Sequence, residues 1–472
     1  MGSDLRHCVV QDIALEMGDA PFGLNLKTKD YTSSGALVVQ GKNVQGRVFD
    51  WSITRHVSDE KYDSIPRSHC YVGDLIFPKV GTIGKVGILS SCKGHSKYLL
   101  STNSMRLKVD PLKANPLFIY YYFSWQKTAN LIHTMNSKSV QPVFNYTSLK
   151  KFPLQLPDLT HQNKSALVLD ALDNKIQLSR KINQTLEHMA QALFKSWFVD
   201  FDLVIDNALA ANNPIPSALQ EHAKRRQKQL SKPEHKRLPA HIQQLFPSEF
   251  VFTKALGWVP EGWTVSTLNH HTNFKNGYSF KSKQLLSTPE NTLPVFKMGH
   301  IKPGGGFKPN GTKSYFPKAE LDENLSSYLA KKGDLLMSMT DVKSKMVILG
   351  NTALMPANNK FLINQRVARL RVNTETHLDY PYLYFYTNQP TVVEELRSRA
   401  NSGVQVNLTS SAIKETLLLV PKPAVHDIFN QQAKAILEQI FANDISIIEL
   451  EQLRDTLLPK LMSGELRLPS EA

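Results

Sequence analysis

Residues 186–202, LEHMAQALFKSWFVDFD, end a run of regularly spaced apolar positions near the middle of a 472-residue chain. Upstream of this stretch the spacing alternates between four and three residues and passes through Leu172, Ile176, Ser179 and Asn183. This alternation is typical of a helix that packs along a coiled-coil seam. The stretch therefore predicts the end of a long helix that carries two adjacent aromatic residues, Trp197-Phe198.

A second run with the same spacing lies 264 residues downstream, where Leu186-Glu187 falls on Leu450-Glu451. We expect a second long helix that matches the first. One interpretation is that each helix packs only on its own domain. A seam sustained over about seven turns favours the other interpretation, that the two helices pack on each other. The seam positions of the second run are Ile436, Ile440, Asn443, Ile447, Leu450, Arg454, Leu457 and Leu461.

The internal similarity extends into the segments before each helix. The aligned pairs, at offsets of 264 or 260, are VQPVFNYTSLKKFPLQLP (140–157) with VQVNLTSSAIKETLLLVP (404–421), FIYYY (118–122) with YLYFY (382–386), and GDLIFPKVG from Gly73 with GDLLMSMTD from Gly333. Because these matches occur in the same order in both halves, they indicate a tandem duplication of one unit.

The duplicated pattern predicts an α/β fold of the mixed α+β kind. We expect two globular domains, separated by a long antiparallel two-helix coiled coil, with internal pseudo-twofold symmetry. The connector contains a basic run from Lys224 to Arg237 and several prolines, and we interpret it as a solvated linker. The expected segments are a first domain at 1–157, a first spacer helix at 158–202, the connector at 203–250, a second domain at 251–424, and a second spacer helix with a C-terminal tail at 425–472.

The charge balance indicates a polyanionic partner. Lys and Arg (56) outnumber Asp and Glu (41), which gives a net charge of +15, and such a surplus favours nucleic acid over simple solubility. Three cysteines without CxxC spacing indicate a reducing compartment and no zinc site. No apolar run is long enough for a membrane span and no signal peptide is visible, so we expect a cytoplasmic protein without a membrane partner.

The sequence contains no recognisable catalytic motif. GTIGKVG lacks the first glycine and the Ser or Thr of a phosphate-binding P-loop, and neither HExxH nor GxSxG occurs. Asp200 and Asp202 lie among phenylalanines without a nearby histidine, so we interpret them as polar residues of a helix end. We therefore predict no catalytic residue, no metal site and no cofactor on this chain.

The helical stretch at 186–202, LEQLRDTLLPKLMSGELRL at 450–468 and LGWVPEGW at 256–263 resemble the DNA-specificity subunit of Type I restriction–modification systems. This resemblance implies two target-recognition domains that each read half of a split, asymmetric sequence in double-stranded DNA. It also implies that two methyltransferase subunits dock on the coiled coil and that restriction subunits join through them. S-adenosylmethionine and ATP are then expected on the partner subunits.

Candidate DNA-binding residues are chosen by chemistry, because no motif identifies them. Lys and Arg contact phosphates, whereas Asn and Gln read base edges, and turn-rich loops beside strands are the expected carriers. Each of these residues has the alternative of a solvated surface position. The candidates are Lys79, Lys85, Lys138 and Gln141 in the first domain, and Lys343, Lys345, Asn401 and Gln405 in the second.

Candidate subunit-interface residues lie on the two helices. Trp197 and Phe198 have two open interpretations: they are interior, where the first helix meets its own domain, or they form a contact for a methyltransferase subunit, since aromatic residues are enriched in interface hot spots. The expected interface residues are Leu186, Met189, Leu193, Trp197, Phe198, Leu450, Leu453, Leu457 and Leu461.

Two alternatives compete with the specificity subunit. A coiled-coil adaptor whose globular domains bind protein is disfavoured by the basic charge balance. A stand-alone DNA-modifying enzyme is disfavoured by the absence of a nucleotide or metal motif.

Overall fold

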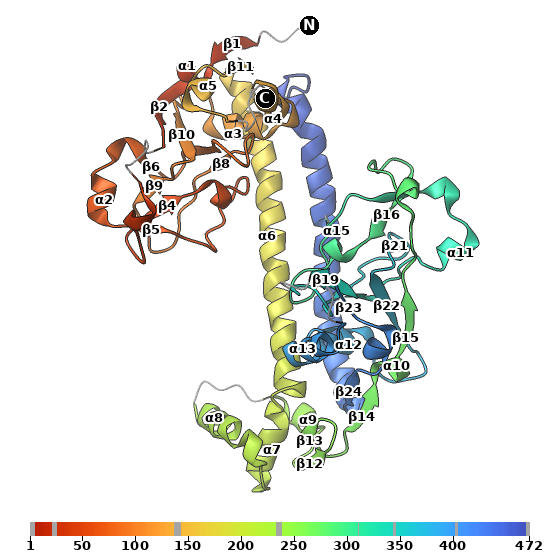
Figure 1. The fold of residues 1–472 in the computed structure, drawn as a ribbon. Coiled ribbons are helices and arrows are strands. Elements are labelled where there is room, and N and C mark those ends of the chain that lie inside the picture. The colour runs from red at the N-terminus through yellow and green to blue at the C-terminus, as the bar shows by residue number, and fades with distance from the viewer. Residues whose placement is uncertain are drawn as a thin grey trace. The chain divides into compact units, whose positions relative to one another are not determined.

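The chain divides into two compact units in the computed structural model, which describes residues 5–20, 26–135, 143–232, 238–309, 311–342, 346–401 and 405–468 (Figure 1). The first unit comprises residues 1–178 and 449–472, and the second unit comprises residues 179–448. Each unit therefore contains a globular domain and a portion of both long helices.

Two 40-residue helices, α6 (Leu159–Phe198) and α15 (Pro423–Met462), start 264 residues apart. Within the first unit, His161 Nε2 lies 2.9 Å from the carbonyl oxygen of Leu461, and Arg454 donates to Asp173 at 2.8 Å. Since a lower number on α6 pairs with a higher number on α15, the helix segments of this unit are antiparallel.

The helix segments of the second unit pack in the same antiparallel sense. Asn183 bonds to Asn443 at 2.7 Å, and the Phe194 and Phe429 rings lie 5.6 Å apart. The prediction that the two helices pack on each other, as an antiparallel pair, is thus confirmed in each unit.

Three sheets build the first unit, in the orders β1-β11, β2-β10-β7-β8 and β3-β5-β4-β9-β6. The strands are β1 (Arg6–Val9), β2 (Ala14–Gly18), β3 (Tyr31–Thr32), β4 (Ala36–Val39), β5 (His56–Val57), β6 (His69–Cys70), β7 (Leu75–Pro78), β8 (Gly87–Ile88), β9 (Tyr98–Leu100), β10 (Ser104–Val109) and β11 (Pro153–Leu156). The short helices are α1 (Val10–Ile13), α2 (Asp59–Asp63), α3 (Pro116–Ser124), α4 (Gln126–Met135) and α5 (Tyr146–Lys150).

The second unit contains sheets in the orders β12-β13, β14-β24, β15-β22-β18-β20, β17-β16-β21 and β19-β23. The strands are β12 (Phe250–Thr253), β13 (Gly257–Pro260), β14 (Thr264–Thr267), β15 (Thr272–Asn276), β16 (Thr292–Phe296), β17 (Tyr315–Pro317), β18 (Leu335–Ser338), β19 (Thr340–Val342), β20 (Thr352–Leu354), β21 (Leu362–Ile363), β22 (Val367–Val372), β23 (Gln405–Asn407) and β24 (Leu417–Val420). The short helices are α7 (Asp202–Ala211), α8 (Gln220–Leu230), α9 (Ala240–Gln243), α10 (Leu268–His271), α11 (Glu323–Ser326), α12 (Tyr380–Thr387), α13 (Pro390–Ser398) and α14 (Ser410–Lys414).

The two units repeat one topology. The sheet β2-β10-β7-β8 corresponds to β15-β22-β18-β20, and β1-β11 corresponds to β14-β24. Even single hydrogen bonds recur: the backbone N–H of Gln155 donates to the Tyr122 hydroxyl at 3.3 Å, and that of Leu419 donates to the Tyr386 hydroxyl at 3.2 Å. The predicted duplication and mixed fold class are confirmed by these equivalent elements.

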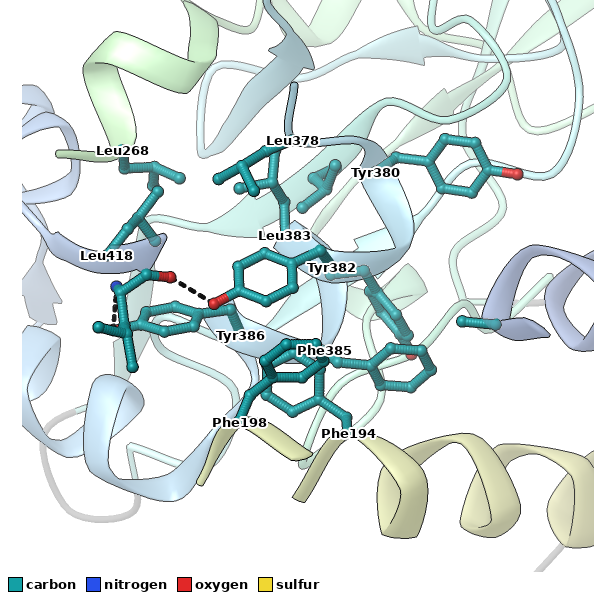
Figure 2. Close-up of a cluster of buried hydrophobic side chains, with 14 of the residues drawn as sticks. Phe194, Phe198, Leu268, Leu378, Tyr380, Tyr382, Leu383, Phe385, Tyr386 and Leu418 are labelled. Carbon is teal, nitrogen blue, oxygen red and sulfur yellow. Dashed lines mark hydrogen bonds between the residues drawn. The ribbon is translucent and has the colours of Figure 1, made fainter. Parts of the chain in front are cut away.

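An aromatic-rich helix packs at the centre of each unit. In the second unit, α12 buries Tyr382, Leu383 and Phe385 against the sheet and against α6, whose Phe194 and Phe198 point toward them (Figure 2). The Tyr382 hydroxyl donates to the carbonyl of Leu419, so its polar end is satisfied inside the core.

The C-terminal end of each long helix packs in the core of the unit that holds the globular domain of the other repeat copy. Trp197 and Phe198, at the end of α6, are 2% and 3% exposed in the core of the second unit. Leu461 and Met462, at the end of α15, are 0% and 1% exposed in the core of the first unit. The aromatic pair of α6 therefore packs inside a domain, and that domain is the second one.

The connector is more ordered than a solvated linker. It forms α7, α8 and α9, and Val204 and Phe246 join the core of the second unit. Arg226 of the basic run donates to both carboxylate oxygens of Asp206, with Nε at 3.0 Å from Oδ1. Pro216 and Pro239 do not interrupt these helical segments. Each stands immediately before a helical turn, where its missing N–H removes no hydrogen bond of the helix.

Candidate nucleic-acid interface

The loop between β7 and β8 presents two candidate lysines of the first unit, Lys79 and Lys85. Gly81 and Gly84 adopt left-handed backbone angles (φ of 76° and 84°), which allows the loop to turn tightly. Lys85 is exposed, whereas the ammonium of Lys79 forms an ion pair with Asp19. Lys85 can meet a phosphate directly, and Lys79 must first leave its carboxylate partner.

The two described candidates of the second unit, Asn401 and Gln405, lie at a two-stranded ribbon. Strand β19 pairs with β23, with Val342 opposite Gln405, and Asn401 forms an isolated bridge to Asn407. Asn401 and Gln405 are both exposed and lie close together in sequence and structure. The other candidates, Lys138, Gln141, Lys343 and Lys345, lie outside the described residues.

Equivalent backbone hydrogen bonds anchor these loops in both units. The N–H of Phe144 donates to the carbonyl of Lys79 at 3.0 Å, and the N–H of Leu408 donates to the carbonyl of Met339 at 2.8 Å. In the second unit Asp341 also accepts from the N–H of Ile348 at 2.7 Å. In each unit, the loop that follows β7 or β18 is thus held against a segment more than sixty residues further along the chain. The composition of the loops alone did not reveal this contact.

The candidate interface residues differ widely in accessibility. Met189 (55% exposed) and Leu453 (47% exposed) present their side chains to solvent. Trp197, Phe198 and Leu461 are buried in the cores described above. The partly buried candidates are Leu186, Leu193, Leu450 and Leu457.

The polar seam positions of the second unit bond to each other. Asn183 Nδ2 donates to Asp444 Oδ1 at 2.8 Å, and Asn443 Nδ2 donates to Asn183 Oδ1 at 2.7 Å. Tyr384 of α12 donates to Glu187 at 3.0 Å beside this group. Burial raises the pKa of Asp444 to about 6, against the opposing effects of Lys302 and the Asn183 hydrogen bond.

The first unit has a corresponding polar group on its helix pair. Asp173 accepts from Arg454 and from the Tyr121 hydroxyl, both at 2.8 Å. Arg47, from the loop after β4, pairs with Asp170 and donates to Asn174 at 2.8 Å. Of the polar seam positions Ser179, Asn183, Asn443 and Arg454, the last three therefore have specific partners on the other helix that favour one register over others.

No group of three or more His, Cys, Asp or Glu side chains that could hold a metal ion occurs among the described residues. Asp202 accepts from Ser196 at 2.6 Å and lies 2.7 Å from His222 Nε2, while Asp200 pairs with Lys195. The expectation that no histidine lies near these acids is therefore wrong for Asp202, because α8 brings His222 against it. The contacts of both acids still fit polar residues at a helix end. Among all the described residues, no helix is long and apolar enough to cross a membrane.

Comparison with known proteins gives the family of this duplicated fold. Residues 59–188 and 260–455, well over half of the chain, match the family described as the Type I restriction modification DNA specificity domain. The chain belongs to this family. Its two matched segments fall in the two copies found in the sequence, so the resemblance inferred from the helical motifs is confirmed.

Members of this Type I specificity family resemble the chain over most of its length. The HindI specificity subunit of Haemophilus influenzae is 26% identical, over 84% of this chain and 86% of that protein. The MjaIX specificity subunit of Methanocaldococcus jannaschii is 23% identical, over 74% and 69%. A crystal structure of a Type I S subunit from M. genitalium shares the fold with a TM-score of 0.55 at 13% identity, covering 100% of this chain and 97% of that one.

Proposed function

We propose that this member of the family is the non-catalytic DNA-recognition subunit of a Type I restriction–modification complex, which binds an asymmetric, bipartite DNA sequence. The observation that carries the proposal is the duplication of one fold whose equivalent loops carry partly different side chains, such as Lys79 in the first copy and Met339 in the second. Among the described candidates, the first copy offers Lys85, and the second offers Asn401 and Gln405. Two similar domains whose loops differ suit two different half-sites.

Phosphate contacts position a protein on DNA, whereas contacts to base edges give specificity. We therefore propose that Lys85 contacts phosphate and that Asn401 and Gln405 read bases. Lys79, Lys138, Gln141, Lys343 and Lys345 belong to the same proposal by their place in the sequence. The net charge of +15 supports binding to a polyanion.

The exposed apolar side chains of the helices support a docking role. Met189 and Leu453 lie on α6 and α15, outside the buried cores. We propose that two methyltransferase subunits bind the helices through such residues and that restriction subunits join through them. S-adenosylmethionine and ATP then belong to the partner subunits, and the cytoplasm is the expected site of action.

Methylation mapping tests this proposal. The chain is combined with the methyltransferase subunit encoded beside it, S-adenosylmethionine and genomic DNA, and methylated adenines are mapped. We expect one split motif that requires this chain. Exchange of one globular domain for that of a relative should change one half of the motif only.

Methylation by the chain alone would instead support an enzyme. A motif that neither requires this chain nor responds to domain exchange would contradict the proposal and favour the protein-binding adaptor.

A further inference from the structure

A group of three cations occupies one face of the strand pair β15-β22 in the second unit. The register places Lys275 opposite Arg369 and Asn273 opposite Arg371. Like charges directly opposite each other on an antiparallel pair are unfavourable. The Tyr328 ring, whose centroid lies 3.8 Å from Lys275 Nζ, offsets part of this cost. An anion bound at this place would offset the rest.

Only one of the three cations has a carboxylate partner. Arg371 donates to both oxygens of Asp334, at 2.6 and 2.7 Å. Lys275 and Arg369 instead share Ser327: Lys275 Nζ lies 2.6 Å from its hydroxyl, and Arg369 Nη1 lies 3.3 Å from its carbonyl. Among the described residues, neither Lys275 nor Arg369 has an ion-pair partner.

The environment of these two cations is already unfavourable for further positive charge. The Nε of Arg369 is buried without a hydrogen-bond partner in the described part of the unit. Burial, followed by the nearby guanidinium groups, lowers the pKa of Lys275. Burial and Arg371 lower the pKa of Arg369 in the same way, against the opposing effect of Asp334. An anion at this place would reverse both effects.

The duplication provides a matched comparison for this position. Arg106 of β10 is the counterpart of Arg369, since SMRLKV (104–109) matches VARLRV (367–372). Arg106 is neutralised by Glu16 at 3.0 Å and by Asp74 at 3.3 Å. The fold therefore does not require an unpaired cation at this position.

Two residue differences between the neighbouring strands, β2 in the first unit and β15 in the second, explain why only Arg106 is neutralised. Glu16 lies opposite Lys108, where the second copy has Asn273 opposite Arg371. Gly18 lies opposite Arg106, where the second copy has Lys275 opposite Arg369. The second copy has thus lost an acid and gained a base at equivalent positions. Because these differences occur in the second copy only, they fit a contact that one of the two domains makes and the other does not.

The strand that carries Lys275 ends beside the candidate DNA-binding ribbon. Asn276, the last residue of β15, lies 3.4 Å from the hydroxyl of Ser410, three residues after β23. Successive side chains of a strand point to opposite faces, so the Asn276 contact places Ser410 and β23 on the face opposite Lys275 and Arg369. The two cations therefore form a surface separate from β23. A DNA backbone fits this surface because it supplies successive phosphates along an extended path.

We propose that Lys275 and Arg369 form a phosphate-binding site of the second recognition domain, which contacts the DNA backbone from the face of the β15-β22 pair opposite β23. The inference rests on the proposed DNA-binding function and assigns residues that charge counting along the sequence did not single out. The Ser327 contacts hold both cations toward one point, which reduces the entropy lost when a phosphate binds.

The salt dependence of DNA binding tests this site. The full chain, assembled with its methyltransferase subunits, is titrated with a short mixed-sequence duplex at several salt concentrations. The double variant Lys275→Gln/Arg369→Gln keeps polar groups of similar length near Ser327 but removes two charges. The matched control Lys254→Gln/Lys318→Gln removes the same charge from exposed positions of the second unit.

Each lost phosphate contact should reduce the slope of log affinity against log salt by about 0.9. Between ~50 and ~200 mM salt, the test variant should then lose about 3.5-fold less affinity than the wild type for each contact removed. The control should keep the wild-type slope. In parallel, inorganic phosphate should raise the melting temperature of the wild type relative to chloride at equal ionic strength, and should do so less in the test variant.

The possible outcomes distinguish an error in the phosphate site from an error in the proposed DNA-binding function. Wild-type DNA binding with equal slopes in test and control variants would overturn the phosphate site and leave the proposed function intact. No DNA binding by the wild-type complex would overturn both. Loss of methyltransferase association with an unchanged slope would assign the two cations to a protein contact and overturn the phosphate site.

Discussion

At the level of single residues, the best-defined feature of the helix pair is the hydrogen bond between Asn183 and Asn443. Replacing Asn183 by Leu leaves the amide of Asn443 and the carboxyl of Asp444 without this partner inside the seam. We expect a loss of about 1–3 kcal/mol in the free energy of unfolding of the second unit. Urea denaturation followed by a probe in that unit measures the loss.

The double variant Asn183→Leu/Asn443→Leu distinguishes a specific pair from two independent polar residues. If the pair is specific, the double variant should lose clearly less stability than the sum of the single variants, because both polar groups leave the seam together. Additive losses would contradict the pairing seen in the structure.

Asp444 gives the same seam a dependence on pH. Its folded-state pKa is raised from 3.8 to about 6, chiefly by burial, so the folded state favours the protonated carboxyl. Stability from this group is fully present below about pH 4 and is lost as the pH rises through about 6. The variant Asp444→Asn keeps an acceptor for Asn183 but has no proton to lose.

We expect Asp444→Asn to be more stable than the wild type at pH 7 by roughly 1–3 kcal/mol, and the two to converge toward pH 4. Thermal denaturation of both proteins across this range gives the difference directly, since contributions from other groups cancel. A difference that stays constant with pH would show that Asp444 does not titrate in this window.

At the level of elements, the end of α6 behaves as part of a domain core. The Trp197 ring lies 5.1 Å from Phe246, and Phe198 lies 5.0 Å from both Tyr382 and Phe429. Trp197→Ala should therefore cost about 3–5 kcal/mol of stability in the second unit, through lost burial and the cavity that remains. Differential scanning calorimetry of the isolated full chain measures this cost.

Met189→Ala is the matched control on the same helix, because its side chain is largely exposed. We expect it to change stability by less than about 0.5 kcal/mol and to weaken methyltransferase binding in a pull-down experiment. The opposite result, a stable Trp197→Ala chain that no longer binds the methyltransferase, would make the aromatic pair a docking contact.

The helices were predictable from sequence because a seam is a periodic signal that survives over many turns. The duplication was predictable for the same reason, since α6 and α15 keep one offset over 40 residues. The helices of the connector were missed because Pro216 and Pro239 precede helical turns instead of interrupting them. The segment around FIYYY forms two helices, α3 and α4, separated at Trp125, which its alignment with YLYFY did not indicate.

The candidate DNA-binding positions were less predictable, for a physical reason. Lys85 and Lys79 lie in one loop and look alike in sequence, yet within the described segments only Lys79 has a carboxylate partner, supplied by Asp19 from a distant strand end. The cations at Lys275 and Arg369 come from strands almost a hundred residues apart, so their proximity depends on sheet register. Local composition carries no information on such pairing.

At the level of the whole molecule, each compact unit needs residues from both copies of the repeat. The first unit, built mainly from the first copy, is completed by residues 449–472 of the second. Leu461 is fully buried there, and its carbonyl lies 2.9 Å from His161 Nε2. The repeat therefore cannot be cut between its copies without opening a core, which distinguishes this chain from two domains joined by a linker.

Leu461→Ala should accordingly destabilise the first unit, although the substitution lies in the second copy. Loss of a fully buried leucine costs about 2–5 kcal/mol, so backbone amides of α3 and β10 should exchange hydrogen faster, while those of α12 should be unchanged. Hydrogen exchange followed by mass spectrometry resolves the two units peptide by peptide. Leu453→Ala, at an exposed position of the same helix, should leave both patterns unaltered. Faster exchange in α12 alone would mean that the end of α15 supports the domain of its own copy, against the core in which the structure buries it.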